Sequence, residues 1–184
     1  RVDVFARIVA ATVLFTVFVT DQWNTIHEHA PRDFYRPVLL ARVLHLGPPT
    51  SATMTALRIV LAVGAVWMFT RRAPRAAAAS VFVSYVVWLL WAFSWSKVDH
   101  DRLTIVVALL VLALTPRVGA AVEQLSGWAL RVVQVVFVLA YPFSAWAKIR
   151  FGGWGWMSSA TFARAIVRRG SSLGDALLSH PALL

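Results

Sequence analysis

The densest group of residues that could perform chemistry is the run Lys-Val-Asp-His-Asp-Arg from Lys97 to Arg102. Lys97 beside a low-dielectric boundary could accept a proton, and His100 could shuttle one while Asp99 or Asp101 orients its ring. Two aspartates and a histidine could also supply part of a metal site, but one loop leaves the ligand shell incomplete. The alternative is a solvated loop whose aspartate caps the next helix. Spacing alone leaves both interpretations open.

A second polar group, His27, Glu28 and His29, follows the first apolar stretch, with Asp33 nearby. Adjacent residues do not share a helix face, so this is not the i, i+4 arrangement of a zinc-binding helix. These side chains could ligate a metal only together with another loop. An ordinary loop is the simpler interpretation, and we expect no resident metal ion.

Gln134, Tyr141 and Lys148 recur at intervals of seven residues, which places them on one face of a helix. A lysine near a helix end can simply extend its ammonium group to the membrane interface. Because a glutamine and a tyrosine share its face, we favour a stripe that faces the interior of a bundle.

Arg58 lies about two turns inside another apolar stretch. A buried arginine is expensive and is usually paired, so Glu28, Asp99 and Asp101 are its candidate partners. Elsewhere, aromatic residues recur at helical spacing. This stripe comprises Ser84, Trp88, Trp91 and Trp95. It predicts ordinary helix packing with an interfacial tryptophan, and the alternative is one wall of a pocket for a flat lipid such as a quinone.

The composition of the chain shows what must position these residues. It is 59% hydrophobic and only 14% charged, with a mean hydropathy of +0.69, which is too apolar for a soluble domain of 184 residues. The chain has no cysteine, which excludes disulfides and thiolate sites. Its net charge of +10 comes from basic residues at the ends of apolar stretches, a membrane pattern, so we expect no nucleic-acid partner.

The apolar stretches predict five transmembrane helices, each near the ~20 residues needed to cross hydrocarbon. They cover 4–22, 53–70, 76–95, 103–121 and 128–147. Pro116 interrupts the end of the fourth, and Pro142 should kink the fifth. The glycine-rich run 152–156 predicts a turn or a short re-entrant loop, and 157–169 predicts an amphipathic helix at the interface.

Loop charges predict the orientation of these helices. The connection after the second span carries Arg71, Arg72 and Arg75 without an acid, so it should be cytoplasmic, as should the N-terminus. The loops 23–52 and 96–102, and the chain from Lys148 onward, then lie outside. The polar groups Trp23 to Tyr35, Lys97 to Arg102 and Lys148 to Trp156 therefore fall on the same outer side.

The order of these elements resembles the HTTM domain, the membrane part shared by vitamin K-dependent γ-glutamyl carboxylases and many bacterial relatives. The matching stretches are Phe34 to Leu44, Ser94 to Leu103, and Gln134 to Ser159. The resemblance implies an outward-facing intramembrane cavity. An abundance of arginine, alanine and valine is typical of bacterial proteins from GC-rich genomes, so we expect a bacterial plasma-membrane protein.

The resemblance also extends to individual residues of the family's motifs. His100 matches the histidine of the family's Asn/Asp-His loop, Lys148 matches the lysine after an aromatic of the fifth span, and Trp156 matches the tryptophan of W-x-x-G. Two positions depart from the family. Ser94 stands where the carboxylases carry a catalytic lysine, and Ser159 replaces the glycine of W-x-x-G.

We therefore predict an all-α integral membrane protein, a polytopic bundle of about five helices plus short interfacial helices. Residues 1–184 form a single HTTM-like domain, truncated at one or both ends because the chain begins at Arg1. The first functional hypothesis is a carboxylase-like or quinone-linked modifying enzyme. Lys97 would be the base, His100 a proton shuttle and Lys148 a stabiliser of an enolate-like or phenolate-like anion. Substrate-binding or structural polar roles fall to Arg58, Asp99, Asp101, Tyr141 and Trp156.

Two alternatives come from different classes of protein. The chain could be a non-enzymatic subunit that anchors or assembles a larger membrane complex, with the lipid bilayer and other membrane subunits as partners. A weaker alternative is a DoxX-like redox membrane protein, because that family shares the Tyr-to-Lys ending of a span.

Overall fold

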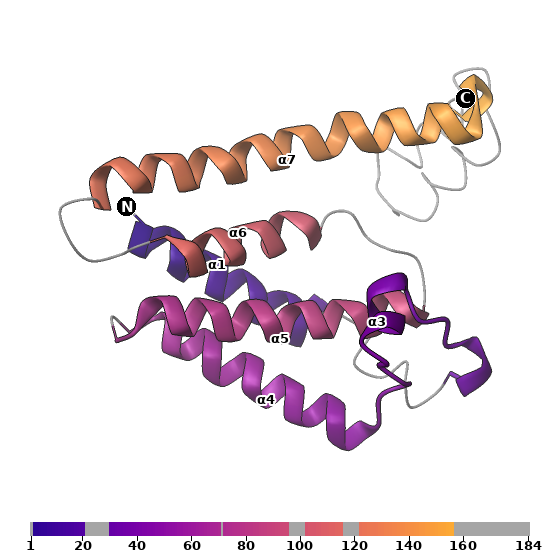
Figure 1. The fold of residues 1–184 in the computed structure, drawn as a ribbon, viewed down its shortest axis with the longest axis horizontal. Helices are drawn as coiled ribbons and strands as arrows, with labels where there is room; N and C mark the ends of the chain where they lie inside the picture. Colours follow the sequence, from indigo (N-terminus) through magenta and orange to yellow (C-terminus); the bar gives the residue numbers. More distant parts are fainter. Residues whose placement is uncertain (1, 21–29, 71, 96–101, 116–121, 157–184) are drawn as a thin grey trace, which may run out of the picture. The chain divides into compact units, whose positions relative to one another are not determined.

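The computed structural model describes residues 2–20, 30–70, 72–95, 102–115 and 122–156 (Figure 1). Within these ranges the chain is helical and contains no strand, which confirms the all-α prediction. The longer elements are α1 (Val2–Phe15), α4 (Ser51–Met68), α5 (Pro74–Trp95), α6 (Leu103–Leu114) and α7 (Val122–Gly152). The shorter ones are the π-helix η1 (Thr16–Thr20), the 3-10 helices η2 (Arg32–Phe34) and η4 (Trp154–Trp156), and the five-residue α3 (Leu39–Val43).

Two compact units divide the chain inside α7, one covering Arg1–Phe137 and the other Val138–Leu184. The first contains the elements from α1 to α6 and the first half of α7. The second contains the rest of α7 together with η4.

Local chemistry explains where the helices of the first unit begin and end. Thr50 caps α4 in an extended conformation, and its hydroxyl accepts a hydrogen bond from the backbone N–H of Thr53 at 3.2 Å. Pro74 occupies the first position of α5, where its missing N–H costs nothing. Helix α6 ends at Leu114, because Pro116 disfavours helical backbone at Thr115, which is extended (φ −79°, ψ 125°). The prediction that this helix reaches residue 121 is therefore wrong.

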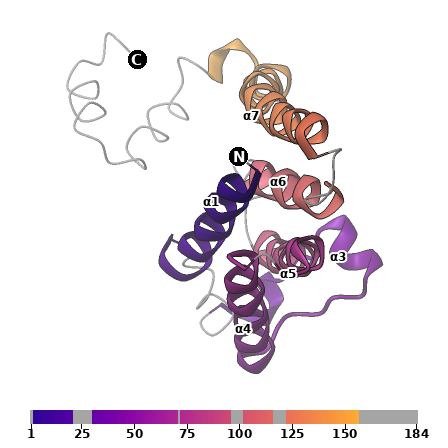
Figure 2. The same ribbon diagram turned by 90° about the vertical axis from the view of Figure 1, so that its left-hand side faces the viewer.

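Helix α5 is the central element of the first unit. It packs against α4 and α6, and α1 packs against both of those helices (Figures 1 and 2). Small residues allow the close approach, as in the helix pairs of membrane proteins. A Cβ added to Gly64 of α4 would lie 2.9 Å from Val81 Cγ2 of α5. The largest fully buried side chains among the described residues come from α4, α5 and α6: Trp88, Tyr85, Leu61, Leu109 and Leu112.

Three helices are long and apolar enough to cross a membrane: 51–68, 74–95 and 130–152. They correspond to three of the five predicted spans. Helix α6, with 12 residues, is apolar but shorter, and α1 contains 14 residues before the five of η1. The structure therefore supports a helical membrane protein, while the number of crossings stays a prediction.

Helix α7 is longer than the predicted span and remains one continuous helix through Pro142. It ends at Gly152, where Gly153 adopts a left-handed conformation (φ 69°) and its N–H bonds to the carbonyl of Ile149 at 2.9 Å. This is the αL helix ending for which glycine is preferred. The helix breaks within the predicted turn, at Gly153, but Gly152 still belongs to α7 and residues 154–156 form the 3-10 helix η4.

Candidate functional site

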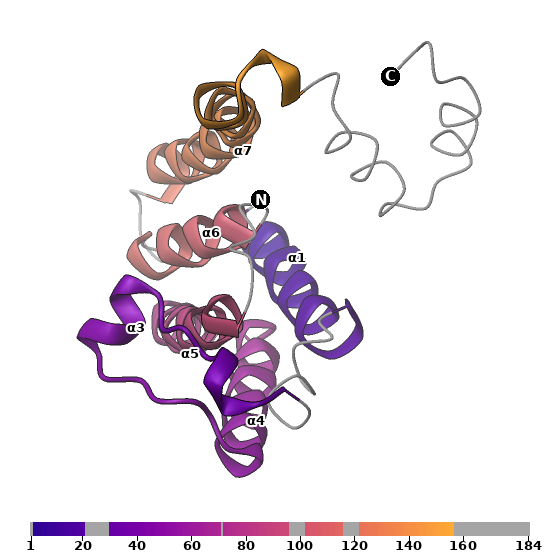
Figure 3. The ribbon, with the colours of Figure 1, turned by 90° about the vertical axis from the view of Figure 1, so that its right-hand side faces the viewer.

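The segment 30–50, here called the α3 segment, is attached to the C-terminal end of α5 (Figures 1 and 3). The buried residue Ser94 makes most of this attachment. Its carbonyl accepts from the N–H of Arg36 at 2.8 Å, and its hydroxyl accepts from the N–H of Val38 at 3.3 Å while donating to the Leu90 carbonyl at 2.5 Å. The backbone of the α3 segment therefore has satisfied partners in the last turn of a membrane-length helix.

Aromatic residues make the second part of this attachment. The Tyr35 hydroxyl donates to the Leu46 carbonyl at 2.8 Å, and Trp91 Nε1 donates to the Gly47 carbonyl at 3.1 Å. The rings of Tyr35 and Trp95 meet edge to face, with centroids 5.2 Å apart. The Tyr35 hydrogen bond joins two parts of the α3 segment, and the contacts of Trp91 and Trp95 join the segment to α5. Together they fix the segment against the end of this helix.

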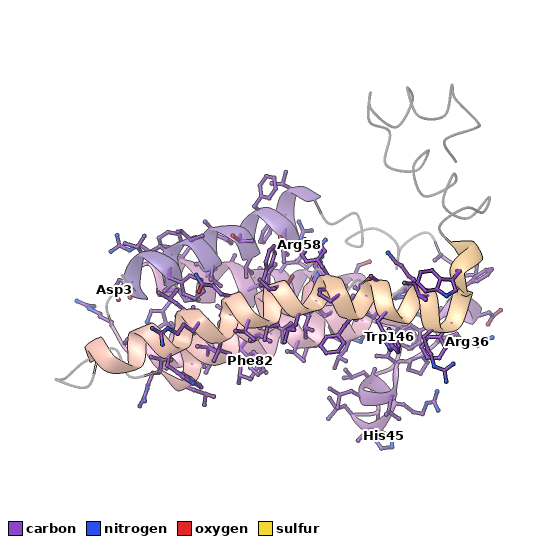
Figure 4. The ribbon with its side chains drawn as sticks, turned by 90° about the horizontal axis from the view of Figure 1, so that it is seen from above. Asp3, Arg36, His45, Arg58, Phe82 and Trp146 are labelled. Carbon is purple, nitrogen blue, oxygen red and sulfur yellow. The ribbon has the colours of Figure 1, made fainter. Side chains whose placement is uncertain are left out.

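Arg58 is half-buried in α4, and Figure 4 shows it between Asp3 at one end of the first unit and Arg36 at the other. Seven residues separate it from the start of α4, which places it about 10 Å along the helix. Its guanidinium carbon lies 5.0 Å from the centre of the Phe18 ring, a cation–π contact. Its Nε atom is buried and has no hydrogen-bond acceptor among the residues that the structure describes.

Several predicted site residues lie outside the described residues, and the proposals about them stay predictions. They are His27, Glu28, His29, Lys97, Asp99, His100 and Asp101, and the side chain of Trp156. The pairing of Arg58 with one of these carboxylates is likewise untested. The segment that carries Lys97 and His100 leaves α5 after Trp95, so by connectivity it starts at the end where the α3 segment is attached.

Tyr141 and Lys148 lie in the second unit, on α7, and both side chains are exposed there. Gln134 is exposed as well. The predicted shared helix face is present, because all three residues belong to one uninterrupted helix. The described packing gives no support to an inward orientation of this stripe.

The aromatic stripe of α5 matches the packing interpretation. Ser84, Trp88 and Trp91 are buried, and Trp88 is among the largest fully buried side chains of the core. Trp95, at the helix end, is half-buried. In the described part of the chain, no cluster of three or more His, Asp, Glu or Cys residues is placed to hold a metal ion.

Sequence reasoning missed the attachment itself. The sequence singled out Ser94 only as the position of the carboxylase lysine. In the structure its hydroxyl instead hydrogen-bonds to backbone groups of Val38 and Leu90. Nothing in the spacing of Tyr35, Gly47 and Trp91 links them, because their contacts join residues up to 44 positions apart. No family model, curated protein or solved structure matches the chain.

Proposed function

We propose that this chain is a multispan membrane protein with a binding site at Arg58, about 10 Å along α4 from the residue at which the α3 segment leads into that helix. In this proposal Arg58 supplies the positive charge for an anionic ligand or for negative charge that develops during a reaction. The observation that carries the proposal is the half-buried guanidinium whose Nε has no acceptor among the described residues.

The energetics of Arg58 favour a functional role. An arginine at the centre of a membrane helix costs about 2.5–3.5 kcal/mol on insertion scales, and less toward the interface. A cation–π contact returns only about 0.5–2 kcal/mol. The residue therefore contributes little or nothing to stability by the contacts described, and intramembrane charges retained in this way commonly mark ligand or ion sites.

The proposed chemistry is that of a quinone-linked or carboxylase-like modifying enzyme. Lys97 would take a proton from a phenol-type hydroxyl with His100 as the shuttle, and Arg58 would stabilise the resulting phenolate. Because Ser94 stands at the carboxylase lysine position and is engaged by the backbone, we place the base at Lys97.

The proposed topology has five crossings, with α1 plus η1 and the shorter α6 completing the three membrane-length helices. One contact fits this topology. Arg75 Nη2, at the start of α5, donates to the Leu114 carbonyl at the end of α6 at 3.1 Å. Both helix ends are predicted to be cytoplasmic, and a cation there complements the C-terminal carbonyls of α6. The N-terminus is then cytoplasmic and the membrane is the bacterial plasma membrane.

The test is ligand binding by the purified full chain in lipid nanodiscs. A short-chain naphthoquinol, kept reduced, and a naphthalene carboxylate are titrated while quenching of tryptophan fluorescence is recorded. We expect Arg58→Gln to weaken binding of the anion at least tenfold, and Lys97→Ala and His100→Ala to weaken binding of the quinol. The matched control is Arg7→Gln, which removes an exposed arginine of α1. Equal binding by all variants, or no binding of either probe, would refute the proposal.

A second candidate function is a subunit that anchors or assembles a membrane complex. The exposure of α7 favours it, because only 6% of its apolar window is buried, compared with 56% for α5. The bulky side chains of Phe143 and Trp146 are 66% and 64% exposed. Isolation in mild detergent of one stoichiometric protein partner, retained by Arg58→Gln and lost on Trp146→Ala, would support this alternative.

A further inference from the structure

The α3 segment presents an exposed surface on which aliphatic and basic residues are interleaved. Four aliphatic side chains of this surface are strongly exposed: Leu39 (76%), Leu40 (49%), Val43 (62%) and Leu44 (52%). Arg36 and Arg42 are exposed beside them, while Ala41 is fully buried. The arrangement is rigid rather than incidental, since it is held by the hydrogen bonds to Ser94 and Trp91 described above.

The attachment to α5 fixes the depth of this surface. Helix α5 has 22 residues and is therefore about 33 Å long, close to the ~30 Å thickness of bilayer hydrocarbon. Its last turn, which holds the α3 segment, accordingly lies at the lipid–water boundary. Trp91 and Trp95 stand in the same turn, and tryptophan is the residue typical of that level. Figure 4 places Arg36 and His45 at this end of the first unit and Asp3 at the other.

We propose that the α3 segment is an interfacial anchor for anionic phospholipids. Leu39, Leu40, Val43 and Leu44 insert among the acyl chains, while Arg36 and Arg42 bind the headgroup phosphates. Charge complementarity supports this occupant, because the segment 32–42 contains Arg32, Arg36 and Arg42 and a single acid, Asp33. Basic residues combined with exposed aliphatic side chains are the pattern of interfacial membrane binding. The inference rests on the proposed membrane location and adds a lipid class to it.

The test uses the absence of cysteine from the chain. Leu40→Cys gives a unique site for a spin label, whose accessibility to oxygen and to a water-soluble nickel chelate reports its depth. Val63→Cys, at an exposed position well inside α4, is the reference for the membrane location itself. In nanodiscs of phosphatidylcholine with phosphatidylglycerol, we expect the label at 63 to be deeply immersed and the label at 40 to lie at the acyl-chain boundary. Val43→Cys repeats the measurement if Leu40→Cys fails to fold.

Charge variants test the headgroup contact. Each arginine near an anionic surface contributes about a fivefold factor to the equilibrium constant for membrane binding. Arg36→Gln with Arg42→Gln should therefore reduce, about 25-fold, the factor by which phosphatidylglycerol raises the ratio of immersed to aqueous label. The matched control, Arg7→Gln with Arg72→Gln, removes the same charge from exposed positions of α1 and the α4–α5 connection. It should leave the label at 40 unchanged.

The outcomes separate the two proposals. If the label at 63 is accessible to water, the membrane location is wrong. If the label at 63 is immersed while the label at 40 is aqueous, only the anchor is refuted. A label at 40 that neither reagent reaches would mean that a second copy of the chain covers the surface, which also overturns the anchor. Equal depth in lipid with and without phosphatidylglycerol would overturn the anionic-headgroup contact.

Discussion

Replacing Arg58 by methionine separates a structural arginine from a functional one. Methionine keeps most of the length and apolar surface of the side chain and removes the charge and the donors. The result depends on what the guanidinium contacts. In the described structure it contacts the Phe18 ring at 5.0 Å, and its Nε has no acceptor there.

The magnitude follows from these contacts. Arg58 lies about 10 Å from the start of α4, between the interface and the bilayer centre, so we take roughly half of the central insertion cost, about 1–2 kcal/mol. Its removal would be offset by the loss of about 0.5–2 kcal/mol of cation–π energy. We therefore expect the free energy of unfolding to change by less than about 1 kcal/mol. Breaking a buried ion pair would instead cost about 3–5 kcal/mol.

The assay is thermal unfolding in mild detergent followed by tryptophan fluorescence, combined with the anion titration. One kcal/mol corresponds to about 2–4 °C for a chain of this length. We expect Arg58→Met to shift the midpoint by less than about 4 °C while anion binding falls at least tenfold. A loss of about 6–20 °C would refute the reasoning, because it would show that Arg58 is paired with a carboxylate. Glu28→Gln, Asp99→Asn and Asp101→Asn would then identify that partner.

Three further predictions concern the packing and attachment of the first unit. Gly64→Ala should cost about 1–3 kcal/mol because its Cβ meets Val81, and adding Val81→Ala should give a less than additive loss in thermal unfolding. His45→Gly should stabilise the chain by about 0.5–1 kcal/mol, since His45 has φ 53°, a left-handed conformation that favours glycine. A lower midpoint of thermal unfolding would contradict this, and His45→Ala, which keeps the Cβ, is the control. Ser94→Ala should cost about 1 kcal/mol and speed proteolysis of the α3 segment, because Val38 loses its acceptor; an unchanged cleavage pattern would argue against the attachment.

The three membrane-length helices could be predicted from the sequence because their signals are local. A run of apolar residues sets the length, and single residues set the ends, as Thr50 does for α4 and Pro74 for α5. The error at α6 has the same local origin. The count of apolar residues predicts a helix that extends to residue 121, whereas the proline at 116 ends the helix at Leu114.

The residue at which α3 ends could not be predicted from sequence patterns. The N–H groups of His45 and Leu46 bond to the carbonyls of Arg42 and Ala41 at 3.1 and 2.9 Å, the two hydrogen bonds of a Schellman ending. Glycine is the usual residue at this left-handed position, and histidine gives no hint of it. The contacts of Ser94 and Trp91 escape prediction for a different reason, since they join segments that are distant in the chain and involve backbone groups common to every residue.

The buried polar groups of the first unit fall into two kinds, and the difference bears on function. Ser94, Trp91 and Tyr35 each donate to a backbone carbonyl, which is what structure in an apolar environment requires of buried polar groups. Two buried donors differ from these, since Arg58 Nε and Trp95 Nε1 have no hydrogen-bond partner in the described chain. Trp95 leaves one neutral N–H without an acceptor, whereas Arg58 carries a full charge, whose burial costs more. The fold would gain by replacing this arginine with an apolar residue, unless the charge serves a ligand. That contrast, rather than the number of charged residues in the loops, makes Arg58 the first residue to test.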